Sequence, residues 1–196
     1  MTDKQLNTPE EIFSCKLDSA LTMESDVLEM LDELQRQTQR HELRELFGTH
    51  AEQTRQHIRN IAESFRLLGE EPDDSPCPVI HAIEKDCNAA IANTRESIVD
   101  AVILAGATEA EHYEIAVYET LVTNAQARGA SEVAALLRQN LEQELSALEK
   151  LKSAERRIST RGIRGRRRVG PSRGCSLDVP SPPVSPETEI AGYPLD

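Results

Sequence analysis

Aromatic and strand-forming residues are scarce in this chain of 196 residues. Aromatic side chains make up 3% of it, and tryptophan is absent. The chain is instead rich in Leu, Ala, Glu, Gln and Arg, which favour helices over strands. Its length fits one domain with a sizeable core and a tail better than two full domains. The composition therefore predicts a single all-α domain.

Long apolar runs, cysteine pairs and nucleotide-binding loops are also absent. No uninterrupted apolar stretch approaches the about 20 residues that cross a bilayer, so we expect no transmembrane segment. The four cysteines form no Cys-x-x-Cys pair, and no charged-then-apolar leader precedes the first expected helix. Residues 162–170 lack the Gly-x-x-x-x-Gly-Lys-Ser/Thr pattern of a phosphate-binding loop. These absences predict a reduced, cytoplasmic protein.

Charge is divided unevenly along the chain. Residues 1–155 carry a net charge of −16, and residues 156–196 carry +4. The acidic part should attract cations and repel nucleic acid, so we expect no nucleic-acid binding by it. The basic part either docks to an acidic partner or folds back onto the acidic part. The sequence leaves both alternatives open.

Apolar residues recur at three- and four-residue steps in four long segments, which is typical of amphipathic helices. Thr8 is the expected N-cap of the first segment, with Pro9 at the first helical position and Glu11 as the capping-box partner. Short turns join the first segment to the second and the third to the fourth. The expected helices cover about residues 9–38, 41–68, 96–127 and 131–158.

The segment between the two helical hairpins is long enough to cross the molecule. Within it, Ser75-Pro76 predicts the start of a short crossover helix. Two hairpins and one long crossover indicate a ferritin-like four-helix bundle. We predict this bundle over residues 1–158. Residues 159–196 are Arg-rich and then rich in Pro and Ser, a composition that predicts a disordered tail.

Carboxylates and a histidine interrupt the buried stripes near the middle of every long helix. Glu24 and Glu144 are each flanked on their helical face by apolar residues. Glu111 and Glu114 lie one turn apart on a third face, and His57 lies within the stripe of the second helix. Antiparallel pairing across the short turns places Glu114 opposite Glu144 and Glu24 opposite His57. The four interruptions therefore share one level of the bundle.

A buried, ionised carboxylate costs several kcal/mol, so four of them beside a histidine require a compensating cation. The pattern predicts a site for two metal ions. A metal-free network that includes Tyr118 or Arg side chains is the alternative. Considered singly, His57 fits a hydrogen-bonded core histidine, and His50 fits that role better than the role of a ligand. The cluster as a whole favours His57 as a ligand.

The run 111–121, EHYEIAVYETL, resembles the EHYEIAxYxTL signature of the YciE/YciF ferritin-like family. Weaker similarity extends over about residues 12–155 and includes Cys77 of the crossover. The resemblance implies a ferritin-like fold, a dinuclear iron centre and a ferroxidase or stress-related role. Manganese or another divalent metal is an alternative to iron.

The resemblance also implies which residues hold the metal. Relatives tend to carry Glu at the position of Gln53 and paired carboxylates where this chain has Gln143 before Glu144. Fewer anionic ligands should weaken the binding of a second hard cation. The implied metal ligands are Glu24, His57, Glu111, Glu114 and Glu144, with Glu52 as a substitute and Gln53 as a neutral, weaker ligand.

Two classes of function fit these observations. The first is a ferroxidase-like di-iron oxidoreductase that oxidises Fe(II) with dioxygen or peroxide in a stress response. The second is a non-catalytic helical scaffold with a degenerate metal site, whose Arg-rich tail docks to an acidic partner. We expect a homodimer or a larger homo-oligomer in either case.

Overall fold

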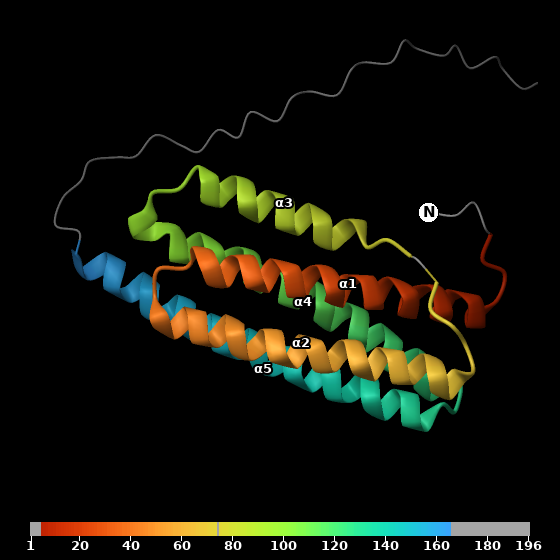
Figure 1. Ribbon diagram of the computed structural model, residues 1–196. Helices are drawn as coiled ribbons and strands as arrows, with labels where there is room; N and C mark the ends of the chain where they lie inside the picture. The colour runs from red at the N-terminus through yellow and green to blue at the C-terminus, as the bar shows by residue number, and fades with distance from the viewer. Residues whose placement is uncertain (1–4, 74, 166–196) are drawn as a thin grey trace, which may run out of the picture. The chain divides into compact units, whose positions relative to one another are not determined.

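The computed structural model describes residues 5–73 and 75–165, and residues 160–165 by their backbone alone. Within these ranges the chain forms helices and connecting turns and contains no strand. The predicted all-α class is therefore confirmed (Figure 1). The helices are α1 (Pro9–Gln37), α2 (His41–Leu68), α3 (Pro78–Ala92), the short 3₁₀ helix η1 (Glu96–Ile98), α4 (Val99–Ala127) and α5 (Ser131–Gly165).

Four long helices close into a bundle. The hairpin of α1 and α2 packs against the hairpin of α4 and α5, with α2 beside α5 and α1 beside α4. Neighbouring helices run in opposite directions (Figure 1). The crossover helix α3 lies outside the bundle against α4 and α1 and returns the chain to the end where α2 began. This arrangement confirms the ferritin-like four-helix bundle with a crossover helix.

Capping residues and glycines mark the helix boundaries. At the start of α1, Thr8 Oγ1 accepts a hydrogen bond from the backbone N–H of Glu11, and the Glu11 carboxylate accepts one from the backbone N–H of Thr8. The predicted capping box is confirmed. Gly69 and Gly129 adopt φ values of 70° and 71° after α2 and α4. This left-handed conformation favours glycine and ends both helices.

Two element boundaries differ from those expected. The crossover helix starts at Pro78 with Cys77 as its N-cap, because Pro78 rather than Pro76 occupies the first helical position. Helix α5 continues past Ile158, the last apolar residue of its stripe, to Gly165. Extending a formed helix adds one hydrogen bond per residue and needs no new nucleus, so a helix can continue past the apolar pattern that predicts it. Residues 166–196, which hold most of the predicted disordered tail and its acidic-partner segment, lie outside the described residues.

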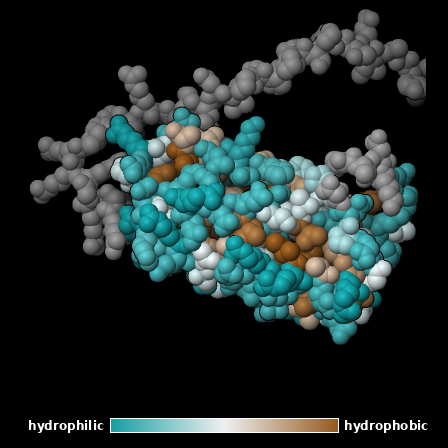
Figure 2. Space-filling model, viewed as in Figure 1, coloured by the Kyte–Doolittle hydropathy of each residue, from teal (hydrophilic) through white to brown (hydrophobic). Residues whose placement is uncertain are grey.

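The apolar core lies on both sides of the polar level. On α1, Leu17 and Met23 are buried on one side of Glu24, and Val27 and Leu34 are buried on the other. The exterior is mainly hydrophilic on the face that Figure 2 shows, with hydrophobic patches between the helices. None of the described helices combines the length and apolar character needed to cross a membrane.

A buried carboxylate ties the turn between α1 and α2 to the start of α4. Asp100 accepts hydrogen bonds from Thr38 Oγ1 at 2.7 Å and from the backbone N–H of Gln39 at 2.8 Å. Its other oxygen lies 3.1 Å from Nε of Arg40. The two hairpins are therefore joined at this end by one hydrogen-bonded carboxylate.

Candidate metal centre

Six ionisable side chains meet inside the bundle, and every one of its four long helices contributes at least one. Each is at most 4% exposed. Helix α2 places two histidines on one face because they are seven residues, or about two turns, apart. The six residues are Glu24 of α1, His50 and His57 of α2, Glu111 and Glu114 of α4, and Glu144 of α5.

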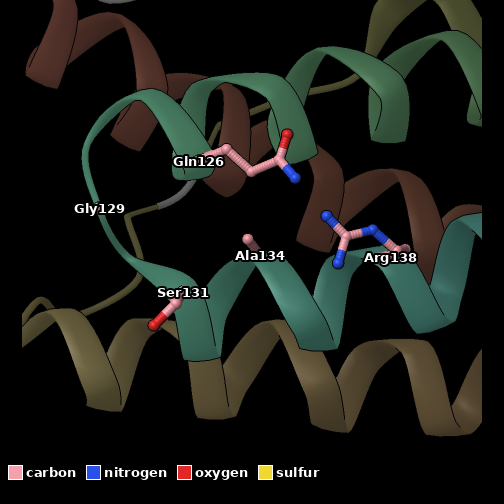
Figure 3. A pocket seen from close by; sticks show the side chains of 5 residues that line it. All are labelled: Gln126, Gly129, Ser131, Ala134 and Arg138. Atoms are coloured by element: carbon pink, nitrogen blue, oxygen red, sulfur yellow. The ribbon is translucent and has the colours of Figure 1, made fainter.

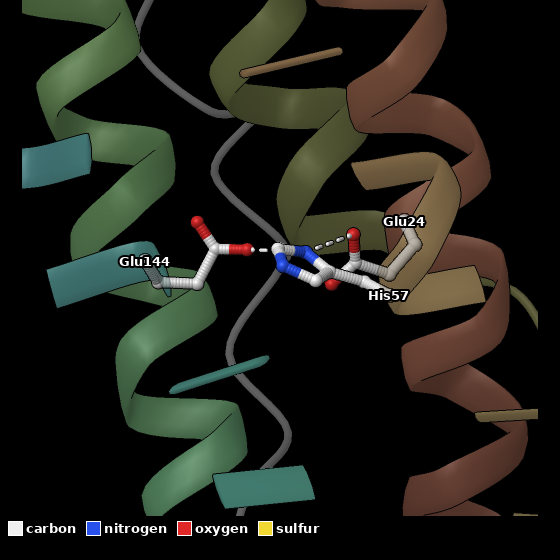
Figure 4. Close-up of side chains that lie close together, drawn as sticks. All are labelled: Glu24, His57 and Glu144. Carbon is white, nitrogen blue, oxygen red and sulfur yellow. Dashed lines mark ion pairs between the residues drawn. The ribbon is translucent and has the colours of Figure 1, made fainter. Parts of the chain in front are cut away.

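The first half of this cluster consists of Glu24, His57 and Glu144 (Figure 4). Nδ1 of His57 lies 2.8 Å from Oε1 of Glu144 and 3.3 Å from Oε2 of Glu24. One candidate ligand atom from each residue lies within 4.8 Å of the other two. Two carboxylates and one imidazole therefore surround a common point that a metal ion could occupy.

The second half consists of His50, Glu111 and Glu144 and satisfies the same distance limit. Nε2 of His50 lies 2.9 Å from Oε1 of Glu111 and 3.4 Å from Oε2 of Glu144. Glu144 thus turns one oxygen toward His57 and the other toward His50. A carboxylate in this position can bridge two cations.

Several carboxylate oxygens in the cluster lack a hydrogen-bond donor. Among the described residues, neither oxygen of Glu114 has a hydrogen-bond or ion-pair partner, although the side chain is fully buried. Oε2 of Glu111 also lacks a hydrogen bond. A buried acceptor without a partner carries a desolvation cost that a bound cation would remove.

Five of the six ionisable groups favour the protonated form. Glu144 is the exception, because burial would raise its pKa but the hydrogen bond and charge of His57 and the charge of His50 lower it. Burial raises the pKa of Glu111 to about 7 against the opposing effect of His50. Burial, with the charge of Glu144 added, raises the pKa of Glu114 well above its ordinary value. Burial would lower the pKa values of both histidines, but the facing carboxylates outweigh it and raise that of His50 to about 9 and that of His57 to about 10. Without a metal, the cluster therefore retains protons.

The charges fit a metal better than a closed network of ion pairs. Two protonated histidines balance only two of the four carboxylates when all four are ionised. No Lys or Arg forms an ion pair with the six residues in the described part of the chain. Either protons or divalent cations must supply the remaining positive charge. Carboxylate oxygens and imidazole nitrogens are common ligands of iron and manganese.

Two glutamines contact the histidine nitrogens that face away from the carboxylates. Nε2 of His57 lies 2.9 Å from Oε1 of Gln143. Nδ1 of His50 lies 3.4 Å from Oε1 of Gln53. An amide oxygen in this position accepts an N–H and leaves the other ring nitrogen to face a metal. Gln143, which from the sequence stands where a ligand is missing, thus contacts a candidate ligand directly.

A chain of hydrogen bonds reaches the cluster from the surface of α2. Asn60 donates to Asn140 Oδ1 at 2.7 Å, and Asn140 donates to the Tyr118 hydroxyl at 3.0 Å. The Tyr118 hydroxyl in turn donates to Oε1 of Glu24. Gln56 begins the chain by donating to Oδ1 of Asn60 at 2.8 Å. Tyr118 is fully buried and therefore both packs in the core, as expected, and orients a candidate ligand.

The structure brings together most, but not all, of the residues that the sequence singled out. Glu52 is exposed and is not part of the cluster. Its carboxylate accepts a hydrogen bond from Arg55 at 2.6 Å on the surface. Gln53 is half-buried behind His50 rather than among the carboxylates. The five others predicted as ligands, Glu24, His57, Glu111, Glu114 and Glu144, are all buried at one level.

Sequence reasoning underestimated His50 and did not identify Asn140. His50 lies seven residues, or about two helical turns, before His57 on one stripe, and this spacing was the available signal. Asn140 lies on the apolar stripe of α5, one turn before Glu144, and is fully buried. A polar residue at such a position indicates a partner across the core.

Other features lie apart from the cluster. Cys77 and Cys87 are buried and form no disulfide. Sγ of Cys77 lies 3.3 Å from the Tyr113 hydroxyl. An open hollow at the α4–α5 turn is lined by Gln126, Gly129, Ser131, Ala134 and Arg138 (Figure 3). None of these lining residues belongs to the carboxylate cluster.

Most of the sequence matches a known protein family. The sequence profile of a family described as a domain of unknown function (DUF892) matches residues 8–163. The chain belongs to the DUF892 family. Protein YciF of Escherichia coli (strain K12) is 32% identical to it over 143 residues, which span 71% of this chain and 85% of YciF. The predicted resemblance to the YciE/YciF family is confirmed.

Solved structures support the same assignment for this DUF892 chain. The crystal structure of the E. coli stress protein YciF matches with a TM-score of 0.73 and 27% identity, over 76% of this chain and 96% of YciF. YcfI of Rhodopseudomonas palustris matches with a TM-score of 0.74 and 27% identity, over 78% of this chain and 98% of YcfI. The matches cover nearly the whole of both relatives, so the shared unit is the complete bundle.

Proposed function

We propose that this DUF892 chain binds a pair of divalent metal ions, with iron as the native metal, and that it oxidises Fe(II) with dioxygen or peroxide. The observation that carries the proposal is the position of Glu144. Its two oxygens face His57 and His50 at 2.8 and 3.4 Å, and each histidine has a further carboxylate beside it. Two adjacent three-residue groups with one shared carboxylate match what a dinuclear centre requires.

The full donor set supports this proposal. Four carboxylates and two imidazoles, drawn from four antiparallel helices, are the ligand types of di-iron centres in helical bundles. Their distribution differs from the common one, because α2 contributes both histidines and α4 contributes the pair Glu111 and Glu114. Oxygen and nitrogen donors of this kind suit iron and manganese more than metals that prefer thiolates.

Each residue has a distinct part in the proposed chemistry. Glu144 would be shared by the two ions, while Glu24 with His57 and Glu111 with His50 would complete the two halves. Glu114 has both oxygens free and lies where the charges of the other carboxylates act on it, so it supplies further negative charge to both positions. The buried walls exclude water and strengthen these interactions. Each Fe(II) would supply one electron to the oxidant.

The stress-related part of the proposal rests on a relative. The solved structure of E. coli YciF is described as that of a stress protein, and this chain shares its fold and 32% of its aligned sequence. Removal of Fe(II) together with peroxide would be a reaction of value to a stressed cell. We therefore propose a stress-related role for this chain as well.

Anaerobic loading of the full chain with Fe(II), followed by removal of free metal and measurement of bound iron, tests the proposal. We expect about two ions per chain, and oxygen consumption with Fe(III) formation when air is admitted. Glu144→Gln should lose most of the bound iron and keep its helical circular dichroism, because the change preserves side-chain size.

Glu142→Gln on the exposed face of the same helix is the matched control and should bind iron as the unchanged chain does. A folded protein that takes up no iron would refute the proposal and favour the alternative of a scaffold with a degenerate site. Iron binding without oxidation would refute only the catalytic part.

A further inference from the structure

The two halves of the cluster differ in the support that surrounds them. In the half around His57, the outer ring nitrogen has a 2.9 Å contact to Gln143, and Glu24 accepts a hydrogen bond from the Tyr118 hydroxyl. In the other half, the corresponding contact from His50 is 3.4 Å long, and Oε2 of Glu111 has no hydrogen-bond partner among the described residues. Only in the half around His57 do both the imidazole and the outer carboxylate have a hydrogen-bond partner outside the cluster, at 2.9 Å or less.

The hydrogen bonds behind Glu24 all point in one direction. Asn60 donates its side-chain N–H to Asn140, which donates its own to Tyr118. Because the Tyr118 oxygen already accepts this hydrogen bond, its single proton is left for Oε1 of Glu24. The other oxygen of Glu24, Oε2, then remains directed toward His57.

We propose that Gln143 and Asn140 are positioning residues that hold His57 and Glu24 in the geometry for a divalent cation, so that the half of the centre around His57 takes the first ion. This inference rests on the proposed metal binding. Beyond metal binding itself, we infer that the half around His57 binds the first ion. Gln143 and Asn140, which are not ligands, determine this order.

The physical basis is preorganisation. Outer hydrogen bonds fix the ring orientation of a ligating histidine and the direction of a ligating carboxylate, and their loss typically weakens metal binding by about tenfold to hundredfold. The Gln143 contact leaves Nδ1 of His57 as the nitrogen that faces the two carboxylates. The ligands of this half therefore need little rearrangement when an ion arrives, whereas Glu111 must still be fixed in place.

A solely structural role is the competing explanation for Asn140. A buried asparagine with every polar atom satisfied also gives a core a unique arrangement without any ligand. Asn140 also donates a longer hydrogen bond, of 3.4 Å, to the backbone carbonyl of His57. The two explanations differ in one consequence. If Asn140 acts on Glu24 mainly through Tyr118, most of its effect on metal binding must disappear when the Tyr118 hydroxyl is removed.

Titration of the metal-free full chain with Mn²⁺, with free Mn²⁺ followed by electron paramagnetic resonance, tests the proposal. We expect two binding steps of unequal affinity. Gln143→Met removes the acceptor at similar size and should weaken the first step by about tenfold to hundredfold. Gln143→Glu keeps an acceptor oxygen for His57 and should retain the first step. Gln53→Met, beside the other histidine, should leave the first step unchanged.

Asn140→Leu should weaken the first step by a similar factor in the unchanged chain and by less than about twofold in a Tyr118→Phe background. If Asn140→Leu does not fold, as judged by circular dichroism, Tyr118→Phe alone tests the same path, because it removes the hydrogen bond to Glu24 and should weaken the first step. The comparison of Gln143→Met with Gln143→Glu tests the contact to His57 independently, at a side chain that is only half-buried.

Three results would overturn the inference while leaving metal binding established: two equal steps in the unchanged chain, no effect of Gln143→Met, or equal losses with Gln143→Met and Gln143→Glu. Failure of the unchanged, folded chain to bind Mn²⁺ and Fe(II) would instead refute the proposed function on which the inference rests.

Discussion

Nδ1 of His57 lies 2.8 Å from Oε1 of Glu144, although the two residues belong to different helical hairpins. Their contact forms only when α2 docks against α5. A cation bound between them would bind the folded bundle and not the separated hairpins, so it would stabilise the fold by mass action. The centre therefore couples metal binding to the association of the two hairpins.

The stability of the metal-free protein should fall as the pH rises above about 5. Folded Glu111 keeps its proton up to its pKa of about 7, whereas the unfolded side chain loses it near 4.5. Folded His50 and His57 keep theirs up to pKa values of about 9 and 10, against 6.5 when unfolded. The folded state thus binds more protons throughout, and each such group lowers the free energy of unfolding by up to about 1.4 kcal/mol per pH unit within its window.

Urea unfolding of metal-free protein between pH 5 and pH 8 in steps of about one unit measures this dependence. Saturating Mn²⁺ should reverse the slope over the same range, because the metal replaces the retained protons. A metal-free protein whose stability rises steadily through this range would contradict the proton retention that the buried cluster predicts.

Glu114→Gln should stabilise the metal-free protein and weaken metal binding. Both oxygens of Glu114 are buried without a partner among the described residues, so at pH 8 the carboxyl group either carries an unpaired charge or keeps a proton that the unfolded chain would release, and both cost stability. The neutral amide removes this cost and adds donors for nearby carboxylates. We expect the free energy of unfolding to rise by about 1–3 kcal/mol in urea at pH 8. Glu109→Gln, on the exposed face of α4, is the control and should change it little.

His50→Leu should reduce the metal content from about two ions per chain to about one. His50 belongs to only one of the two groups that share Glu144, so the group around His57 remains complete. Metal analysis after loading with Mn²⁺ measures the change. His112→Leu on the exposed side of α4 should retain both ions, and an equal loss in that variant would show that the effect is not local.

Asp100→Ala should destabilise the fold without changing the affinity for metal. The variant leaves the hydroxyl of Thr38, the backbone N–H of Gln39 and the guanidinium of Arg40 without their shared acceptor. We expect a loss of about 1–3 kcal/mol in the free energy of unfolding. Asp86→Ala on the exposed face of α3 serves as the control. An unchanged stability in Asp100→Ala would show that the turn does not need this carboxylate.

Much of the architecture could be predicted from local chemistry. The three- and four-residue spacing of Leu and Ala fixes one buried face per helix, and a short turn fixes which residues of two neighbouring helices share a level. These two rules placed Glu24 opposite His57 and Glu114 near Glu144. Local rules could not set where α5 ends, since a formed helix can propagate past the apolar pattern that predicts it.

The sequence by itself determined that four helices would carry polar residues into one level of an apolar core, because helical periodicity fixes both the face and the height of each side chain. Only the tertiary structure decided which atoms meet. Gln53 belongs to the predicted stripe and Glu52 is next to it, yet Glu52 turns to solvent and Gln53 lies behind His50. From the sequence, Gln143 stands where relatives carry a ligand, whereas in the structure it contacts Nε2 of His57. Such choices depend on side-chain rotamers and on the lateral docking of two hairpins, and neither is encoded in the spacing of residues along a single helix.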